Sequence, residues 1–346
     1  MKAGLVGYSQ TGKTTLFNAL TGQRAPAGAG QKAKSNLGVI KVPDERLDRL
    51  TEIYKPRRTA PADVTFVDVP GPRAKGSGLD SATIQALQEA DALVVVLRGF
   101  EDAEGGGPSP VRQLVDFESE LILNDMGVVE RRLERLARER GSERRKAVLE
   151  KCHGALNAEQ SLRRTELSPE DEREISSFAF LSRRPLLAVL NKAEADINRG
   201  VPPELARATR ERDVEVVDVC ASAEAEIATL AREDQAEFLA SLGIKEAASS
   251  RFIRAAHALL DYISFFTVGE DEVRAWTVRR GSKAPNAAGR VHSDIERGFI
   301  RAEVMSYDEF MAVGSEAKMK EQGKLRVEGR DYVVQDGDIV NFRFAV

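Results

Sequence analysis

The chain has 346 residues, of which 42% are hydrophobic, and a formal net charge of −4. This length predicts two or three domains with real cores, and the charge excludes a globally basic surface for nucleic acid. Its two cysteines, Cys152 and Cys220, lie far apart, which argues against a disulfide framework and a cysteine-based zinc site. We expect no signal peptide, and no apolar run approaches the roughly 20 residues that cross a bilayer. A cytoplasmic protein without a membrane partner is therefore expected.

The first predicted strand leads into a phosphate-binding sequence. Gly7-Tyr8-Ser9-Gln10-Thr11-Gly12-Lys13-Thr14 follows the apolar run at positions 3–6 and fits G-x-x-x-x-G-K-[ST]. In such a loop, backbone N–H groups and the start of the next helix hold the phosphates of a nucleotide. We predict that Lys13 reaches the β- and γ-phosphates and that the Thr14 hydroxyl binds Mg²⁺. The other nucleotide contacts predicted in this segment are Gly7, Gln10, Thr11, Gly12 and Thr15.

Further apolar runs predict a doubly wound, mostly parallel sheet, which binds ligands at the carboxyl ends of its strands. The run at 64–67 leads to Asp68-Val69-Pro70-Gly71, a D-x-x-G sequence. There Asp68 is predicted to hold the metal through water, and the Gly71 N–H to sense the γ-phosphate. Lys13 and Gly71 are thus the predicted catalytic residues.

Two later strand ends are predicted to hold the nucleotide base. The runs at 186–190 and 214–219 lead to the segments 191–194 and 220–222. In GTPases these positions carry N-K-x-D and S-A-K. The predicted base contacts are Asn191, Lys192, Glu194, Cys220, Ala221 and Ser222.

Two regions lie outside this sheet. Residues 114–180 have helix formers with a leucine-rich apolar stripe, and Gly141-Ser142 predicts the turn of an antiparallel helical hairpin. Residues 130–150 hold eight Lys and Arg against five Glu, which fits either a solvated coiled-coil tip or a contact with RNA phosphates. From Phe265 to Val346, short β-type runs alternate with glycine turns, which predicts a small α+β binding module. The predicted domains are therefore 1–113 with 181–262, 114–180, and 263–346.

Nearly the whole chain resembles the YchF/Obg-like ATPases, which belong to the translation-factor class of P-loop NTPases. The segments that carry the resemblance are Val42–Asp48, Cys220–Glu226, Phe265–Gly269, Glu272–Thr277, Gly298–Val304 and Gln335–Asp338. The resemblance implies a ubiquitin-like TGS domain at the C-terminus and a coiled-coil arm between the D-x-x-G and N-x-x-E strands. It also implies slow hydrolysis of ATP, often preferred over GTP, and association with ribosomes.

The chain also departs from common patterns. Glu194 replaces the aspartate of N-K-x-D, and its longer side chain is poorly placed for paired hydrogen bonds to guanine, whereas Lys192 keeps the GTPase-like lysine. Base preference therefore stays open. The segment that aligns with the first switch, residues 31–36, has Ser35 as its only hydroxyl, and Pro72 stands where many GTPases have a glutamine that orients water. We expect slow turnover.

The sequence thus predicts a Mg²⁺-dependent NTPase that binds and slowly hydrolyses ATP or GTP and acts as a switch on the ribosome or ribosomal RNA. The alternatives are a nucleotide-binding scaffold that never turns over, a GTP-preferring GTPase, and a P-loop kinase, which N-x-x-E and the missing arginine-rich lid disfavour. Two basic surfaces are candidates for RNA. They comprise Arg131, Arg132, Arg135, Arg138, Arg140, Arg144, Arg145 and Lys146 in the hairpin, and Arg274, Arg279, Arg280, Lys283, Arg290 and Arg301 in the C-terminal module.

Overall fold

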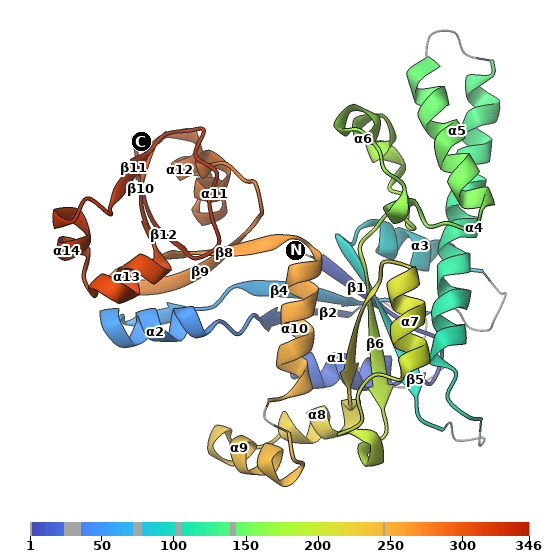
Figure 1. Cartoon of the computed structure of the whole chain (residues 1–346), viewed down its shortest axis with the longest axis horizontal. Coiled ribbons are helices and arrows are strands. Elements are labelled where there is room, and N and C mark those ends of the chain that lie inside the picture. The colour runs from blue at the N-terminus through green and yellow to red at the C-terminus, as the bar shows by residue number, and fades with distance from the viewer. Residues whose placement is uncertain are drawn as a thin grey trace. The chain divides into compact units, whose positions relative to one another are not determined.

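The computed structural model describes residues 2–23, 36–71, 78–101, 106–138, 143–244 and 246–345. The chain forms two compact units, of which unit 1 comprises residues 1–40 and 65–259, and unit 2 comprises residues 41–64 and 260–346. Figure 1 shows the elements of both units, coloured by residue number. Within the described ranges, no helix is both long and apolar enough to span a bilayer.

Unit 1 is built on a sheet with the strand order β2-β4-β1-β5-β6-β7. β1 pairs in parallel with β4 and β5, and β6 pairs in parallel with β5 and β7. The carboxyl ends of these five strands therefore meet at one edge of the sheet. The strands are β1 (Lys2–Val6), β2 (Asn36–Lys41), β4 (Asp63–Asp68), β5 (Ala92–Gly99), β6 (Leu186–Lys192) and β7 (Glu215–Val219). This confirms the predicted parallel sheet.

Helices cover both faces of this sheet (Figure 1). On one face, α3, α4 and α7 bury Leu87, Phe117 and Leu205 in one cluster with strand residues. On the other face, Phe252 of α10 packs on Phe66 of β4 with ring centroids 5.2 Å apart. The helices of unit 1 outside the insertion are α1 (Lys13–Thr21), α3 (Ser81–Gln88), α7 (Pro203–Glu211), α8 (Ala221–Ile227), α9 (Arg232–Ser241) and α10 (Ala248–Leu259).

The helical insertion begins with a single long helix that serves two cores. α4 (Pro110–Leu136) first packs on the sheet through Leu114, Phe117 and Leu121. Its later turns pack with α5 (Glu143–Asn157) and α6 (Pro169–Ile175) around Val129, Leu149 and Leu156. The apolar stripe predicted for one hairpin is therefore divided between the sheet and the insertion. The predicted turn at Gly141-Ser142 and Arg140 lie outside the described residues.

Unit 2 contains a second sheet with the strand order β11-β10-β12-β8-β9-β3. β8 and β9 are antiparallel, β12 runs parallel to β8, and α11 packs on one face through Ala284, Ala287 and Ala288. The elements from residue 262 onward are β8 (Tyr262–Thr267), β9 (Glu272–Arg279), α11 (Ala284–Val291), α12 (Ser293–Arg297), β10 (Phe299–Ser306), α13 (Tyr307–Val313), α14 (Glu316–Glu321), β11 (Arg326–Glu328) and β12 (Asp338–Phe344). These elements match the α+β pattern read from the sequence.

Unit 2 also takes in a segment that the sequence-based boundaries assigned to the nucleotide-binding domain. β3 (Arg58–Ala60) pairs in parallel with β9. Arg46 of α2 (Glu45–Tyr54) donates to Asp336 at 2.9 Å and lies 5.3 Å from the Phe266 ring centroid. Residues 41–64 therefore find their partners in the C-terminal sheet, although they precede β4 in the chain.

Candidate nucleotide-binding site

The predicted phosphate loop connects β1 to α1 at the carboxyl edge of the unit 1 sheet. Gly12 adopts a left-handed backbone with φ of 78°, and a Cβ at this position would overlap the Asn191 side chain. Glycine is therefore required both for the backbone conformation and for the close approach. The Thr11 hydroxyl donates to the Tyr8 carbonyl oxygen at 3.1 Å and closes the loop.

The predicted phosphate lysine and the predicted metal-binding aspartate are brought together. The register between β1 and β4 aligns Leu5 with Asp68, so Asp68 stands beside the start of the loop. Lys13 Nζ forms an ion pair with Asp68 Oδ1, and these side chains are only 13% and 8% exposed. Asn36 Nδ2 donates to the other carboxylate oxygen at 3.4 Å. A cation and an anion therefore share the N-terminus of α1.

The D-x-x-G segment lies directly against the phosphate loop. A Cβ on Gly71 would overlap the Gly7 carbonyl oxygen, so only glycine permits this approach. The Pro70 carbonyl accepts a hydrogen bond from the Thr83 hydroxyl at 3.0 Å, which ties the segment to α3. Pro72 and Ser35, which bear on turnover and on the first switch, lie outside the described residues.

Asn191 joins three parts of the site. It is 3% exposed at the end of β6. Its Nδ2 donates to the Thr11 carbonyl oxygen at 2.9 Å, and its Oδ1 accepts from the Ala221 N–H at 2.9 Å. One side chain thus links the phosphate loop to the segment after β7.

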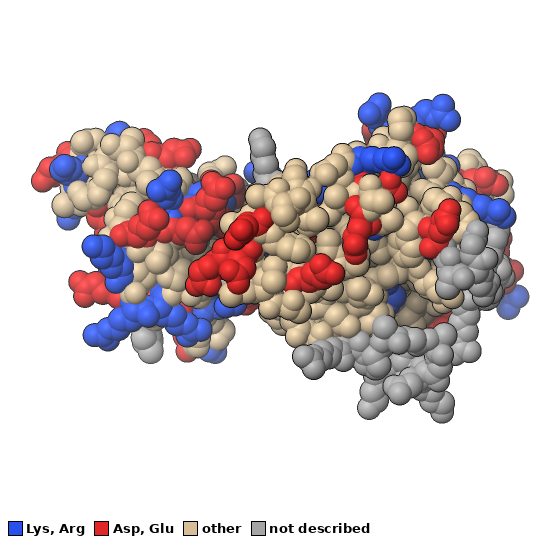
Figure 2. All heavy atoms as spheres, turned by 90° about the horizontal axis from the view of Figure 1, so that it is seen from below, with Lys and Arg blue, Asp and Glu red and all other residues tan. Residues whose placement is uncertain are grey.

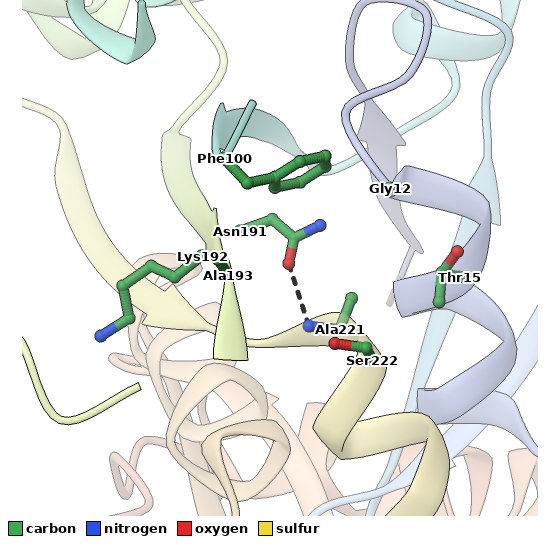
Figure 3. Close-up of a pocket in the computed structure, with 8 residues that line it drawn as sticks. All are labelled: Gly12, Thr15, Phe100, Asn191, Lys192, Ala193, Ala221 and Ser222. Atoms are coloured by element: carbon green, nitrogen blue, oxygen red, sulfur yellow. Dashed lines mark hydrogen bonds between the residues drawn. The ribbon is translucent and has the colours of Figure 1, made fainter. Parts of the chain in front are cut away.

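A cavity of about 290 Å³ opens beside this link. Figure 3 shows the Phe100 ring on one side of Asn191 and Ala221 with Ser222 on the other. The lining residues are Gly12, Thr15, Phe100, Asn191, Lys192, Ala193, Ala221 and Ser222. Sequence reasoning missed Phe100, although an aromatic residue directly after the buried strand β5 was a usable signal. Cys220 does not line the cavity and lies buried with Sγ 3.2 Å from the Ser222 hydroxyl.

Lys192 and Glu194 do not present their charges to the cavity. The Lys192 side chain points away from it (Figure 3), and its Nζ lies 2.6 Å from Asp218 Oδ2. Glu194 is exposed at the start of the short 3-10 helix η3 (Glu194–Asp196) and is not a lining residue. The Lys192 ammonium group therefore lies away from the cavity, and Glu194 is not among the residues that line it.

Tyr8 anchors the phosphate loop on the face of the sheet that α3 and α4 cover. It packs against the core cluster that contains residues of α3 and α4. Burial raises the pKa of the Tyr8 phenol, and the carboxylates of Asp116 and Glu120 on α4 raise it further. The phenol is therefore neutral at physiological pH and carries no charge toward the phosphates.

The chain matches known proteins over its whole length. Residues 2–125 match a family described as 50S ribosome-binding GTPases, and residues 262–345 match the YchF GTPase C-terminal family, described as a protein of unknown function. The ribosome-binding ATPase YchF of Bacillus subtilis (strain 168) is 38% identical over 365 residues, covering 100% of both chains. The protein of the same name from Haemophilus influenzae is 41% identical, covering 100% of this chain and 99% of that protein.

A solved structure gives the same result. The YchF GTPase of Schizosaccharomyces pombe is 30% identical to this chain, with a TM-score of 0.89. The match covers 99% of this chain and 97% of that chain. The chain therefore belongs to the YchF family of P-loop nucleotide-binding proteins.

Proposed function

We propose that this protein binds ATP, and also GTP, with Mg²⁺, hydrolyses the triphosphate slowly, and acts as a nucleotide-dependent switch on the ribosome. The observation that carries the proposal is the buried Lys13–Asp68 pair at the N-terminus of α1, beside the contact between Gly71 and Gly7. The pair brings a cation suited to phosphate and a carboxylate suited to a metal to the start of α1, where backbone N–H groups would face a phosphate. Relatives named ribosome-binding ATPases support the rest of the proposal.

The residues present fit a magnesium ion. Mg²⁺ prefers oxygen ligands and usually binds through one or two protein groups together with waters and phosphates. The Thr14 hydroxyl on the first turn of α1 and the Asp68 carboxylate would hold it. When bound, the ion would neutralise charge on the phosphate oxygens.

The chain's own side chains explain how a triphosphate would bind, but they do not provide a group for its rapid hydrolysis. Lys13 would exchange Asp68 for the β- and γ-phosphate oxygens, since charge-assisted contacts to phosphate are the strong ones. Gly71 closely approaches Gly7 in the loop, and its N–H would donate toward a γ-phosphate bound there. Pro72 has no side-chain donor to orient water, so we expect little turnover until a partner supplies the missing group.

The helical insertion is the favoured surface for ribosomal RNA. Arg144 is paired with Asp171 at 3.1 Å and Arg145 with Glu174 at 2.9 Å, so both serve the α5–α6 packing. Arg131, Arg135 and Arg138 near the end of α4 are exposed.

Several basic residues of unit 2 have close acidic partners, whereas Arg290 Nε donates to the Thr277 carbonyl oxygen at 3.2 Å. Lys283 lies 2.6 Å from Asp331, and Arg280 lies 2.9 Å from Asp261. On the face drawn in Figure 2, basic and acidic side chains are interspersed. The mixed sheet of unit 2, with β8 and β12 parallel, supports assigning residues 263–346 to a TGS domain. We therefore propose that the insertion contacts the RNA. We propose that unit 2 binds its partner through the shape of its surface rather than through a net positive charge.

A steady-state phosphate-release assay with ATP and GTP, with and without ribosomes, tests the proposed activity. We expect a slow signal above that of Lys13→Ala and a faster one when ribosomes are added. A wild-type signal equal to that of Lys13→Ala in both conditions would favour a scaffold that never turns over.

Base choice gives a second test. Because none of the described residues that line the cavity is an aspartate that could pair with guanine, we expect ATP to bind at least as well as GTP. Glu194→Asp is expected to shift the ratio toward GTP by no more than about tenfold, since Lys192 is held by Asp218 and adds nothing. Calorimetric titration of both nucleotides measures the ratio, and a wild type that prefers GTP by about tenfold or more contradicts the assignment.

The ribosome contact can be tested by charge reversal at and just beyond the C-terminal end of α4. The double variant Arg135→Glu/Arg138→Glu is expected to lose most co-sedimentation with ribosomes at low salt, and wild-type association should fall steeply as salt rises. Arg207→Glu on α7, whose side chain is 80% exposed, is the matched control. ATP affinity should be unchanged in both variants. If the double variant co-sediments with ribosomes as well as the Arg207→Glu control does, the contact does not lie on the insertion.

A further inference from the structure

The ammonium group of Lys192 is held away from the cavity by three acceptors. Its Nζ lies 2.6 Å from Asp218 Oδ2, donates to the Ile197 carbonyl oxygen at 3.1 Å, and also donates to the Arg199 carbonyl oxygen. The Lys192 side chain is 4% exposed. An ammonium group has three hydrogens, so these contacts use all of its donors and leave none for a nucleotide.

The Lys192–Asp218 pair spans the two strands whose ends form the walls of the cavity. The register of β6 and β7 aligns Leu190 with Asp218, so the two charged residues stand near the carboxyl ends of neighbouring strands. Ala193 directly follows Lys192, while Ala221 and Ser222 come shortly after Asp218, and all three line the cavity. The ion pair therefore fixes the spacing between the two walls.

The same ammonium group also holds the loop between β6 and α7. The carbonyl groups of Ile197 and Arg199 lie just beyond η3, so their contacts with Lys192 close the loop that carries Glu194. Removing the ammonium would release this loop. It would also leave Asp218 with Arg251 as its remaining cation, at 3.5 Å. The Asp218 side chain is 16% exposed, and a poorly compensated carboxylate largely withdrawn from water is unfavourable, so we expect the loop and the strand ends to shift.

We propose that Lys192 is a positioning residue of the base cavity, which holds its two walls at the spacing that a purine requires and takes no part in choosing between adenine and guanine. The inference rests on the proposed function, because it needs a bound purine nucleotide. A lysine at this place in the N-K-x-D pattern suggests a direct effect on base preference. The geometry instead gives Lys192 a positioning role, which it shares with Asp218.

Three ligands separate the two roles: ATP, GTP and inorganic tripolyphosphate, which has no base. Lys192→Met keeps the aliphatic stem and removes the charge, and Asp218→Asn removes the partner. Each variant is expected to bind ATP and GTP about tenfold more weakly, with the ratio of the two affinities unchanged. Tripolyphosphate affinity should stay at the wild-type value, because Lys13 and the phosphate loop are intact. The double variant should be no weaker than either single variant, since both remove the same interaction.

Controls separate this inference from the proposed function. A wild type that binds none of the three ligands contradicts the proposed function itself. A wild type that binds all three, with Lys192→Met changing the ATP to GTP ratio by about fivefold or more, overturns only the positioning role. An unchanged affinity in Lys192→Met also overturns it. Lys2→Met, at an exposed lysine 3.6 Å from Glu89, is the matched control.

Folding is checked first by thermal unfolding of every variant. If a single variant does not fold, the double variant carries the comparison, because neither buried charge is then left without its partner. If the protein folds only when both residues are intact, Lys192 and Asp218 serve the stability of the sheet, and the positioning role is overturned.

Discussion

Lys13→Ala is expected to weaken the binding of ATP and GTP by at least about a hundredfold, or roughly 3 kcal/mol. The phosphate loop places Lys13 at the N-terminus of α1, and its ammonium group pairs with Asp68 there. Its removal takes away the cation that would pair with the β- and γ-phosphates. Backbone N–H groups of the loop, the metal ligands and the base cavity would hold the remaining affinity.

The same substitution leaves the Asp68 carboxylate, which is 8% exposed, without its lysine. Some stability is therefore expected to be lost, and Lys13→Ala/Asp68→Asn should recover it without recovering nucleotide affinity. Calorimetric titration gives the affinity, and thermal unfolding shows that each variant is folded. Lys2→Ala, at the opposite end of β1, is the matched control. A folded Lys13→Ala that binds ATP within about threefold of wild type would end the phosphate-loop interpretation.

Local patterns predicted the parts of unit 1 that are themselves local. The apolar run at 92–97 lies within β5, because a strand buried on both faces requires an unbroken apolar sequence. The G-x-x-x-x-G-K-T sequence predicted a strand, a loop and a helix, because the left-handed glycine and the helix N-terminus that it requires are neighbours in the sequence.

Non-local pairing set the limit of the prediction. β3 is three residues long and finds its partner β9 more than two hundred residues later in the chain. Nothing in residues 58–60 identifies that partner, so residues 41–64 were assigned with the strands that flank them in the sequence. The sequence also did not show that α4 packs both on the sheet and within the insertion. One amphipathic stripe looks the same whether it packs on a sheet or on another helix.

The candidate site was predicted by residue type but not by side-chain direction. Asn191, Ala221 and Lys13 lie where the motifs placed them. Lys192 turns away because Asp218, within the apolar run before Cys220, offers a carboxylate that is only partly exposed on the neighbouring strand. A charged residue inside such a run was the available signal, since an unpaired charge is not tolerated there. Its partner could be identified only from the sheet register.

Removing the buried carboxylate of Glu118 is expected to have the largest effect on stability. Glu118 lies in α4 with a side chain 7% exposed, and it forms an ion pair with Arg163, whose side chain is 6% exposed. It also accepts from the Ser161 hydroxyl at 2.9 Å and lies 3.1 Å from Arg212 Nε. Burial lowers the pKa of Arg163 to about 10, so the guanidinium stays charged at neutral pH. One carboxylate therefore joins α4 to the segments after α5 and α7.

Glu118→Ala is expected to lower the free energy of unfolding by about 3–5 kcal/mol, because it leaves the Arg163 charge buried without its partner. Urea denaturation followed by circular dichroism measures the loss. The single tryptophan, Trp276, lies in β9 of unit 2, so its fluorescence should report a smaller change. Glu134→Ala, at an exposed position on the same helix, is the matched control and should cost less than about 0.5 kcal/mol. Glu118→Leu/Arg163→Met should recover part of the loss, since an apolar pair leaves no buried charge. Equal losses in Glu118→Ala and Glu134→Ala would mean that the carboxylate does not hold α4 in place.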